Sequence, residues 1–347
     1  MPPTLSVSSR TVLPNPALAN STSVLPLVVE PKSRRSVVLG VLTAVQEAIG
    51  CALQRDTDVI ANTTHYKNID VKAAMADPHY VFFGETQCTV LNPEGEVGPF
   101  YVLGEYVRDD LRDGEAGIDM IVETQVLDVA TCSPLVGSWV DIWNANTTGV
   151  YSGVQSSMNL GNPSDASNLN NTALRGIQQV DEDGVAKFTT KFPGHYDGRA
   201  THMHVVVHTD ATEQRNGTIT GGKIPHIGQL FWDQDLITEI EALSPYNENT
   251  ADITLNANDH VFGAQETEGT TSDPVFNYVY LGDDVTDGLF AWVVLAVNSS
   301  ATYDATYSFA LTSGGGVAVE GGGSGVSGLP SSGFPSSSAA VPSSTVA

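Results

Sequence analysis

The 347-residue chain is poor in basic residues. It carries 15 Lys and Arg against 40 Asp and Glu, which gives a formal net charge of −25 and a pI near 4.3. Nucleic acids and anionic membranes attract proteins through clustered Lys and Arg side chains. The charge balance therefore argues against both as partners, and it suits a soluble protein in an acidic medium.

Cysteine is also rare, since the chain has only Cys51, Cys88 and Cys132. No C-x-x-C motif or Cys/His cluster is present, so nothing in the sequence suggests a cysteine-based zinc site. Cys88 precedes a Gly-Pro-Phe-Tyr motif and Cys132 lies in a predicted turn at residues 130–134. In an oxidising compartment we expect these two to form a disulfide and Cys51 to stay outside it.

Long apolar runs are missing as well. Residues 37–49 form a run of about 13 residues that Gln46 and Glu47 interrupt, which is short for a stable membrane span. Basic residues at 32–35 precede this run and small residues at 50–52 follow it, which is the layout of a signal peptide displaced to residues 32–52. Two interpretations fit equally: a misassigned start or exon, or an amphipathic helix packed on the domain.

Several features favour an extracellular protein. The sequence contains six N-x-S/T glycosylation sequons, at Asn20, Asn62, Asn146, Asn170, Asn216 and Asn298. From residue 313 the chain is rich in Gly and then in Ser and Pro, a composition typical of a disordered, O-glycosylated tail. The sequence therefore predicts a leader and linker at 1–77, a folded domain at 78–312 and a disordered tail at 313–347.

Short strands dominate the central part of the sequence. Apolar and polar residues alternate over 120–126, an Asp-Glu-Asp-Gly turn leads into a strand at 185–192, and 289–297 is apolar enough for a buried strand. Only residues 235–243 have a convincing helical pattern. This pattern predicts a mainly-β fold, an antiparallel β-sandwich with long loops and disordered ends.

The most informative segment is Pro-Gly-His-Tyr-Asp-Gly-Arg-Ala-Thr-His-Met-His at residues 193–204. A β-branched run follows it, so His202 and His204 are expected on one face of a strand, where two imidazoles can bind one metal ion. His208 shares that face but lies about 13 Å further along the strand, too far to share the ion. The phenol of Tyr196 favours a strongly Lewis-acidic cation, and ferric iron fits best.

A second tyrosine, Tyr151, is the penultimate residue of the motif D-I-W-x-x-N-x-x-G-x-Y-S. This motif, then L-R-G-I-Q-x-x-D-x-x-G, then F-P-G-H-Y-x-G-R-x-x-H-x-H, resembles the intradiol ring-cleavage dioxygenases. That family includes catechol 1,2- and protocatechuate 3,4-dioxygenases, and the likeness is to its secreted fungal branch. It spans roughly residues 85–310, including G-P-F-Y at 98–101 and H-I-G-Q-L-F at 226–231.

The resemblance implies a non-haem Fe(III) ion with four ligands, Tyr151, Tyr196, His202 and His204. It implies that a catechol is cleaved by O2 between its hydroxyl-bearing carbons, giving a muconate-type diacid. Tyr196 would leave the metal and accept a substrate proton, and Arg199 would stabilise charge on the ring. Only two residues separate Tyr196 from Arg199, as in the secreted branch, whereas the intracellular enzymes have a longer loop there.

The substrate pocket is less defined by the sequence. Gly98 and Pro99 form a turn that would present Phe100 or Tyr101 to an aromatic ring, or make them a hydrophobic plug under the site. Gln178 follows the Arg-Gly step and could contact oxygen or substrate, or form a structural hydrogen bond.

Two other functions remain compatible with parts of this pattern. One is a non-catalytic secreted β-sandwich that binds phenolics, glycans or iron. The other is a zinc hydrolase in which Asp197 joins the histidines. The oligomeric state and the natural catechol are not encoded in any motif.

Overall fold

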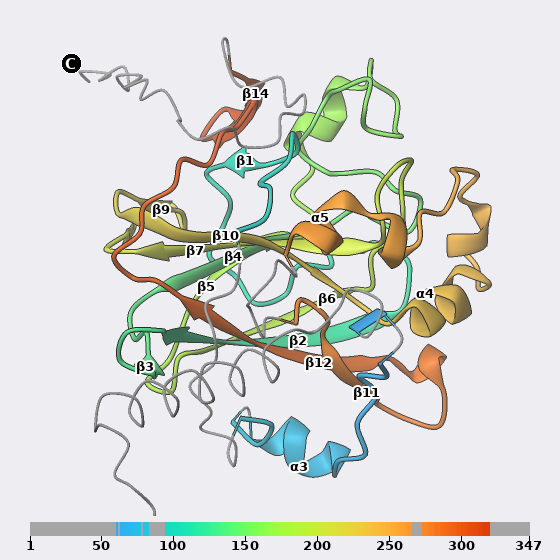
Figure 1. The fold of residues 1–347 in the computed structure, drawn as a ribbon. Helices are drawn as coiled ribbons and strands as arrows, with labels where there is room; N and C mark the ends of the chain where they lie inside the picture. Colours follow the sequence, from blue (N-terminus) through green and yellow to red (C-terminus); the bar gives the residue numbers. More distant parts are fainter. Residues whose placement is uncertain (1–59, 62, 78, 83–93, 266–272, 320–347) are drawn as a thin grey trace, which may run out of the picture. The chain divides into compact units, whose positions relative to one another are not determined.

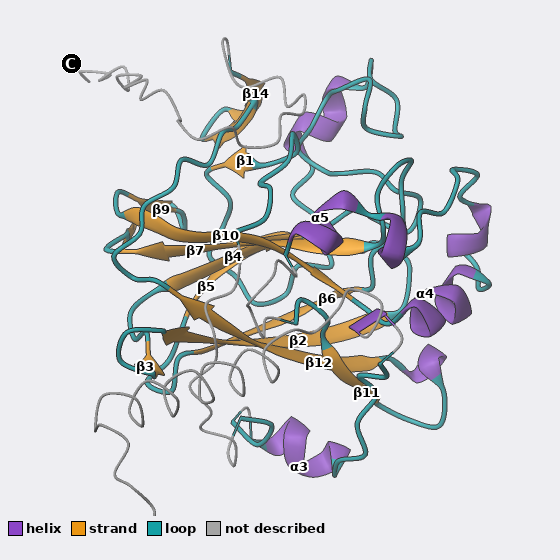
Figure 2. Cartoon of the chain, in the orientation of Figure 1, coloured by secondary structure: helices purple, strands orange, loops and turns teal. Residues whose placement is uncertain are grey.

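A computed structural model of the protein describes residues 60–61, 63–77, 79–82, 94–265 and 273–319. Strands and loops make up most of these residues and the helices are short (Figure 2). The mainly-β fold that the sequence predicts is therefore confirmed. The expected leader up to residue 59 and the last part of the tail, from residue 320, lie outside the described residues.

The first sheet has four antiparallel strands and carries the His-x-His segment. Its order is β10 (Lys223–Phe231), β7 (His202–Thr209), β4 (Trp139–Trp143) and β5 (Arg175–Gln179). The register sets His204 opposite Trp143 on one side and Gln229 on the other. Residues paired across antiparallel strands share a face, so these side chains lie together.

The second sheet departs from the purely antiparallel arrangement expected from the sequence. Its order is β11 (Asn277–Tyr280), β12 (Leu289–Val297), β2 (Asp119–Asp128) and β3 (Ser133–Pro134), and β6 (Val185–Lys191) also pairs with β2. The pair β2–β12 is parallel over its whole length. Long connections allow this, since β2 and β12 are far apart in sequence and need no hairpin.

One hydrophobic cluster joins the two sheets. Val140, Val205 and Leu230 of the first sheet share it with Val122 and Leu295 of the second. Side chains alternate between the two faces of a strand. Trp143 of β4 and His204 of β7 alternate with residues of this cluster, so both face away from it. Figure 1 shows the two layers, with β4, β7 and β10 above β2 and β12. The imidazoles therefore lie on the outer face of the first sheet, where loops cover them.

Short elements surround the two sheets. The helices are α3 (Val71–Ala76), α4 (Gln234–Glu241) and α5 (His260–Ala264), and α4 confirms the helix expected at 235–243 within two residues. Four 3-10 turns and five minor strands complete the described part: Ala166–Asn170, Tyr246–Glu248, Asn256–Asn258, Val285–Asp287, β1 (Val102–Leu103), β8 (Thr212–Glu213), β9 (Ile219–Thr220), β13 (Phe309–Thr312) and β14 (Gly315–Ala318).

The folded unit extends beyond both predicted domain boundaries. Upstream of residue 78, the ring of His65 bonds Asp233 and Asp273, and Tyr66 bridges to β11. Downstream of 312, β14 pairs with β13, so the tail begins later than the Gly-rich composition indicated. Gly-Gly-Gly at 314–316 reads as a linker in the sequence, but here it turns and pairs in a hairpin.

Two other sequence expectations concern the ends and the cysteines. No helix in the described part of the chain is long and apolar enough to cross a membrane. Cys132 is disulfide-bonded, but Cys88 and Cys51 lie outside the described residues, so the Cys88–Cys132 pairing stays a prediction.

Candidate metal centre

His202 and His204 occupy the first and third positions of β7 and point to the same side of the sheet. Their Nε2 atoms are 3.1 Å apart, and both side chains are buried. The Nδ1 atom of His202 lies 2.6 Å from the Ala200 carbonyl oxygen, which can only accept a hydrogen bond. The proton therefore sits on Nδ1, and the Nε2 lone pair faces His204.

Tyr151 enters this group from the long loop after β4. Its hydroxyl oxygen is 3.2 Å from the Nε2 of His204 and 3.4 Å from the Nε2 of His202. The amide of Asn159 fixes the loop, because it accepts from the Tyr151 backbone N–H and donates to the Tyr151 carbonyl, each at 2.8 Å. Asn168 donates a further bond to that carbonyl. Both the N–H and the carbonyl of Tyr151 are thus bonded, which fixes the backbone from which its phenol projects.

Tyr196 completes the cluster from a tight turn just before β7. Its hydroxyl oxygen lies 3.3 Å from the Nε2 of His202. A bridge between Tyr196 and Arg199 closes the turn, and Gly198 adopts φ +80° there, a conformation that favours glycine. Tyr196 is half-buried, whereas Tyr151 is 1% exposed. The two phenols therefore differ in access to solvent.

Burial keeps all four groups neutral in the absence of a cation. Burial and then the charge of Arg199 lower the pKa of His202 to about 3, and burial followed by the charge of His202 lowers that of His204. Burial raises the pKa of the Tyr151 phenol, as does neighbouring Tyr196, and burial also raises the pKa of Tyr196. Neutral imidazoles are the form that binds metals, and only a strong Lewis acid would ionise such phenols.

This donor set fits ferric iron. Two nitrogen and two phenolic oxygen atoms converge, with donor-to-donor distances of 3.1–3.4 Å, as expected for donors about 2 Å from one cation. Within the described residues, no group of three or more His, Cys, Asp or Glu side chains could hold a metal. Asp197 points elsewhere, since its carboxylate accepts from the Asp252 N–H, so the zinc-hydrolase alternative lacks its carboxylate ligand.

Arg199 borders the cluster but is already paired. Its Nε donates to Asp259 at 2.8 Å, and its Nη2 donates to the side-chain oxygen of Gln229. Asp259 also accepts from the Ala200 N–H and caps α5. Arg199 therefore lies beside the cluster, with its orientation set by Asp259 and Gln229.

Gln229 is a site residue that our reading of the sequence missed. It is fully buried, bonds Arg199, and donates to the Glu96 carbonyl at 2.9 Å. The available signal was its place in the H-I-G-Q-L-F motif together with strand alternation. Only the register of β10 against β7, with Gln229 opposite His204, shows that it faces the donors.

The two aromatic residues of the Gly-Pro-Phe-Tyr turn contact different parts of the structure. Phe100 stacks on the ring of Tyr151 at 4.6 Å and lies edge-on to Tyr196, and half-buried Pro99 precedes it. Tyr101 instead packs against Trp143 and donates its hydroxyl to Asp141 at 3.2 Å. Phe100 is thus a wall of the centre, and Tyr101 is the plug beneath it.

Gln178 does not join the cluster. In β5 it pairs with Val140, whose side chain lies in the core between the sheets, so Gln178 is on the face opposite His204. A contact with oxygen or substrate is therefore wrong for Gln178, because the two-residue period of the strand turns it away. His208 stays apart from the donors as expected, 3.5 Å from Asp141.

The fold and these residues define the class: a mainly-β protein with a two-tyrosine, two-histidine centre. Residues 98–224 match the profile of a family described as Dioxygenase. A search of curated proteins gave no match.

Solved structures give the same result. An intradiol ring-cleavage dioxygenase from Tetranychus urticae is 28% identical, with a TM-score of 0.51 over 62% of this chain and 98% of that one. A second solved dioxygenase is 27% identical, with a TM-score of 0.50 over 62% of this chain and 98% of its own. Over the matched residues the chain is similar in sequence and in fold to the intradiol ring-cleavage dioxygenases.

Proposed function

We propose that this chain is an extracellular Fe(III) enzyme that cleaves catechol rings between the two hydroxyl-bearing carbons. The observation that carries the proposal is the convergence of Tyr151, Tyr196, His202 and His204. One catechol and one O2 would give one cis,cis-muconate-type diacid, with both oxygen atoms retained in the product. Secretion is supported by the signal-like segment at 32–52 and the six sequons.

Fe(III) bound at the four donors would supply the Lewis acidity that ionises the phenols and activates the catechol toward O2. The rest of the chemistry falls to side chains. Tyr196 is half-buried and sits on a two-residue turn, so its phenolate oxygen is the better placed of the two to take a catechol proton. Tyr151, locked by Asn159 and Asn168, would remain in place.

Arg199 and Phe100 would both help to stabilise the negative charge that develops on the substrate ring. In a site with little water, a fixed cation stabilises developing negative charge more strongly than it would in water. Asp259 and Gln229 hold the guanidinium in one orientation before substrate arrives. Phe100, stacked on Tyr151, excludes water from that side.

Oxygen uptake with product identification tests the proposal. Catechol should consume one O2 per ring, and ¹⁸O2 should place both labelled atoms in a muconate-type diacid. Resorcinol, with its hydroxyls in a 1,3 relationship, is the matched substrate control and should consume none. A ring-opened semialdehyde, or no oxygen uptake by iron-loaded protein with several catechols, would refute intradiol cleavage.

A further inference from the structure

Arg175 is a buried arginine directly behind the candidate centre. It begins β5, is 3% exposed, and makes four hydrogen bonds. Removing a guanidinium from water is costly unless it is paired and fully bonded. The burial of the Arg175 guanidinium therefore calls for a structural or functional explanation.

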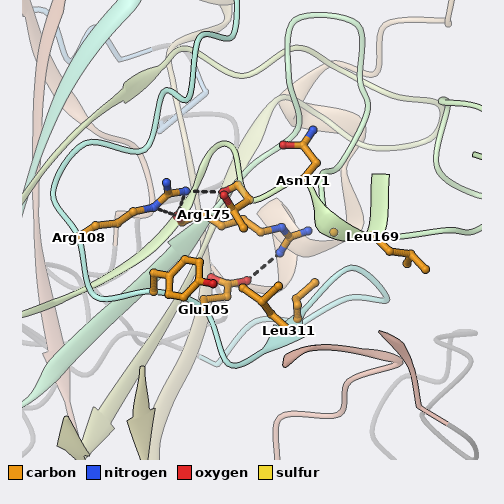
Figure 3. Close-up of a pocket in the computed structure, with 10 residues that line it drawn as sticks. Glu105, Arg108, Leu169, Asn171, Arg175 and Leu311 are labelled. Carbon is orange, nitrogen blue, oxygen red and sulfur yellow. Dashed lines mark hydrogen bonds and ion pairs between the residues drawn. The ribbon is translucent and has the colours of Figure 1, made fainter. Parts of the chain in front are cut away.

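Its counter-ion is Glu105, at 2.9 Å from Nη1 and 2% exposed. A small cavity of about 10 Å³ borders this pair (Figure 3). That volume holds about one water molecule. The cavity is too small for an organic ligand, so the buried charges serve the neighbouring residues.

Those neighbours are two residues next to Tyr151, one along the chain and one packed on its ring. The Nε of Arg175 donates to the carbonyl and hydroxyl oxygens of Ser152, the next residue in the chain, at 3.0 and 3.1 Å. Its Nη2 donates to the carbonyl of Phe100, the ring stacked on Tyr151, at 2.8 Å. The guanidinium carbon itself lies 5.9 Å from the centre of the Tyr151 ring.

We propose that Arg175 is a positioning residue for the tyrosine ligand Tyr151. Its fork holds Ser152, the next residue in the chain, and Phe100, which stacks on the ring, and its charge stabilises electron density on the phenolate. This inference rests on the proposed function, because it concerns Tyr151 as an iron ligand. It adds a role for the Arg of the L-R-G motif, to which sequence analysis assigned none.

The same cavity supplies a matched control. Arg108 also lines it (Figure 3). Its guanidinium bonds the backbone carbonyls of Thr172 and Arg175 and the carboxylate of Asp113. It thus resembles Arg175 in pairing and in backbone bonds, but none of these bonds goes to Ser152 or Phe100. Because Arg108 bonds the backbone carbonyl of Arg175 and not its side chain, Arg108→Lys removes a comparable fork and leaves the side-chain bonds of Arg175 to Ser152 and Phe100 in place.

The experiment compares iron retention and the tyrosinate-to-iron absorption band in iron-loaded protein. Arg175→Lys keeps the charge but cannot reach both carbonyls, so it should retain iron about 10- to 100-fold less tightly, with the band near its original wavelength. Arg175→Met combined with Glu105→Gln removes the charge without leaving a buried carboxylate unpaired. It should shift the band to longer wavelength, since the phenolate then donates its electron more readily.

The outcomes separate this inference from the function itself. A wild-type protein without iron or colour refutes the proposed function. The positioning role is refuted if the wild type is coloured and Arg175→Lys retains iron as tightly as both the wild type and Arg108→Lys. If the double variant does not fold, the Lys variant still decides; if it folds with an unshifted band, the electrostatic part is wrong.

Discussion

His202 and His204 bring their Nε2 atoms to 3.1 Å from each other, and both rings are held by neighbouring residues. Trp143 stacks on His204 with an interplanar angle of 3°, and Ala200 fixes the tautomer of His202. Two lone-pair atoms are therefore directed at the same small volume by rigid strand geometry. Outer contacts of this kind usually orient metal-binding histidines.

Tyr151→Phe should lose most of the iron, because the Tyr151 hydroxyl is the one within 3.4 Å of both histidines. Iron per protein, by elemental analysis, measures the effect. Tyr246→Phe is the control: Tyr246 is equally buried, and its hydroxyl bonds the Ile118 N–H and the Phe192 carbonyl instead of the donors. That variant should cost about 1 kcal/mol of stability and keep its iron. Full iron content in Tyr151→Phe would contradict the ligand assignment.

Asp259→Asn should lower kcat about tenfold or more with iron retained. The ion pair with Arg199 is lost, and a charge-assisted hydrogen bond contributes about 1.5–3 kcal/mol. Asn remains a good helix cap, so α5 should persist. Asp284→Asn, at the cap of the turn Val285–Asp287, makes the same change at an exposed position and should leave turnover intact. Equal kcat in both variants would remove Asp259 from the account.

Substrates that carry a carboxylate, such as protocatechuate, should have a lower kcat/KM than catechol. Two arginines lie near enough for their charges to lower the pKa of His204, and both are already in ion pairs, Arg199 with Asp259 and Arg175 with Glu105. Neither is therefore free to pair with a substrate carboxylate. Exposed Glu96 lies close by, since its carbonyl accepts from Gln229. Glu96→Gln should raise the value for protocatechuate roughly two- to fivefold, the size of an exposed charge interaction, and less at high salt.

The control for this change is Glu213→Gln, which removes an equal charge from exposed β8. It should leave the ratio of the two substrates as in wild type. A protein that prefers protocatechuate, or equal effects of both substitutions, would show that local charge does not select the substrate.

Stability should fall as pH rises from about 6.5 through 9, through His65. Burial alone would lower its pKa, but hydrogen bonds from the ring to Asp233 and Asp273 outweigh it and raise the pKa to about 9. A raised folded-state pKa means that the stabilisation is complete below the unfolded value of 6.5 and is lost above 9. Since solvent reaches part of the pair, we expect about 2 kcal/mol.

Unfolding by denaturant at pH 6 and pH 9.5 measures this loss, with His65→Gln as the variant that lacks it. The difference between wild type and variant should shrink at the higher pH. A difference that is constant or grows with pH would show that His65 is not charged in the folded protein.

The sequence predicted the strands, and the shared face of the two histidines, where the pattern was local. The apolar run at 289–297 is β12, and the strand period alone placed His202 and His204 on one face. It failed where long-range pairing decides. Gln178 and Gln229 are both glutamines in family-like motifs, and only the registers of β5 and β10 show that the first faces the core and the second faces Arg199.

The burial of Arg175 was equally inaccessible from sequence. Its partner Glu105 lies 70 residues away, and charged residues are ordinarily exposed. The parallel pairing of β2 and β12 likewise joins segments more than 150 residues apart, which no local pattern reports.

The visible absorption spectrum of the purified, iron-loaded protein tests the central claim most directly. Phenolates bound to Fe(III) give a charge-transfer band, so the account predicts a burgundy protein with one iron per chain. Anaerobic addition of catechol should then shift the band as the substrate displaces one phenolate. A colourless protein that binds no iron, or a colour that Tyr151→Phe and Tyr196→Phe both leave unchanged, would contradict the two-tyrosine, two-histidine centre.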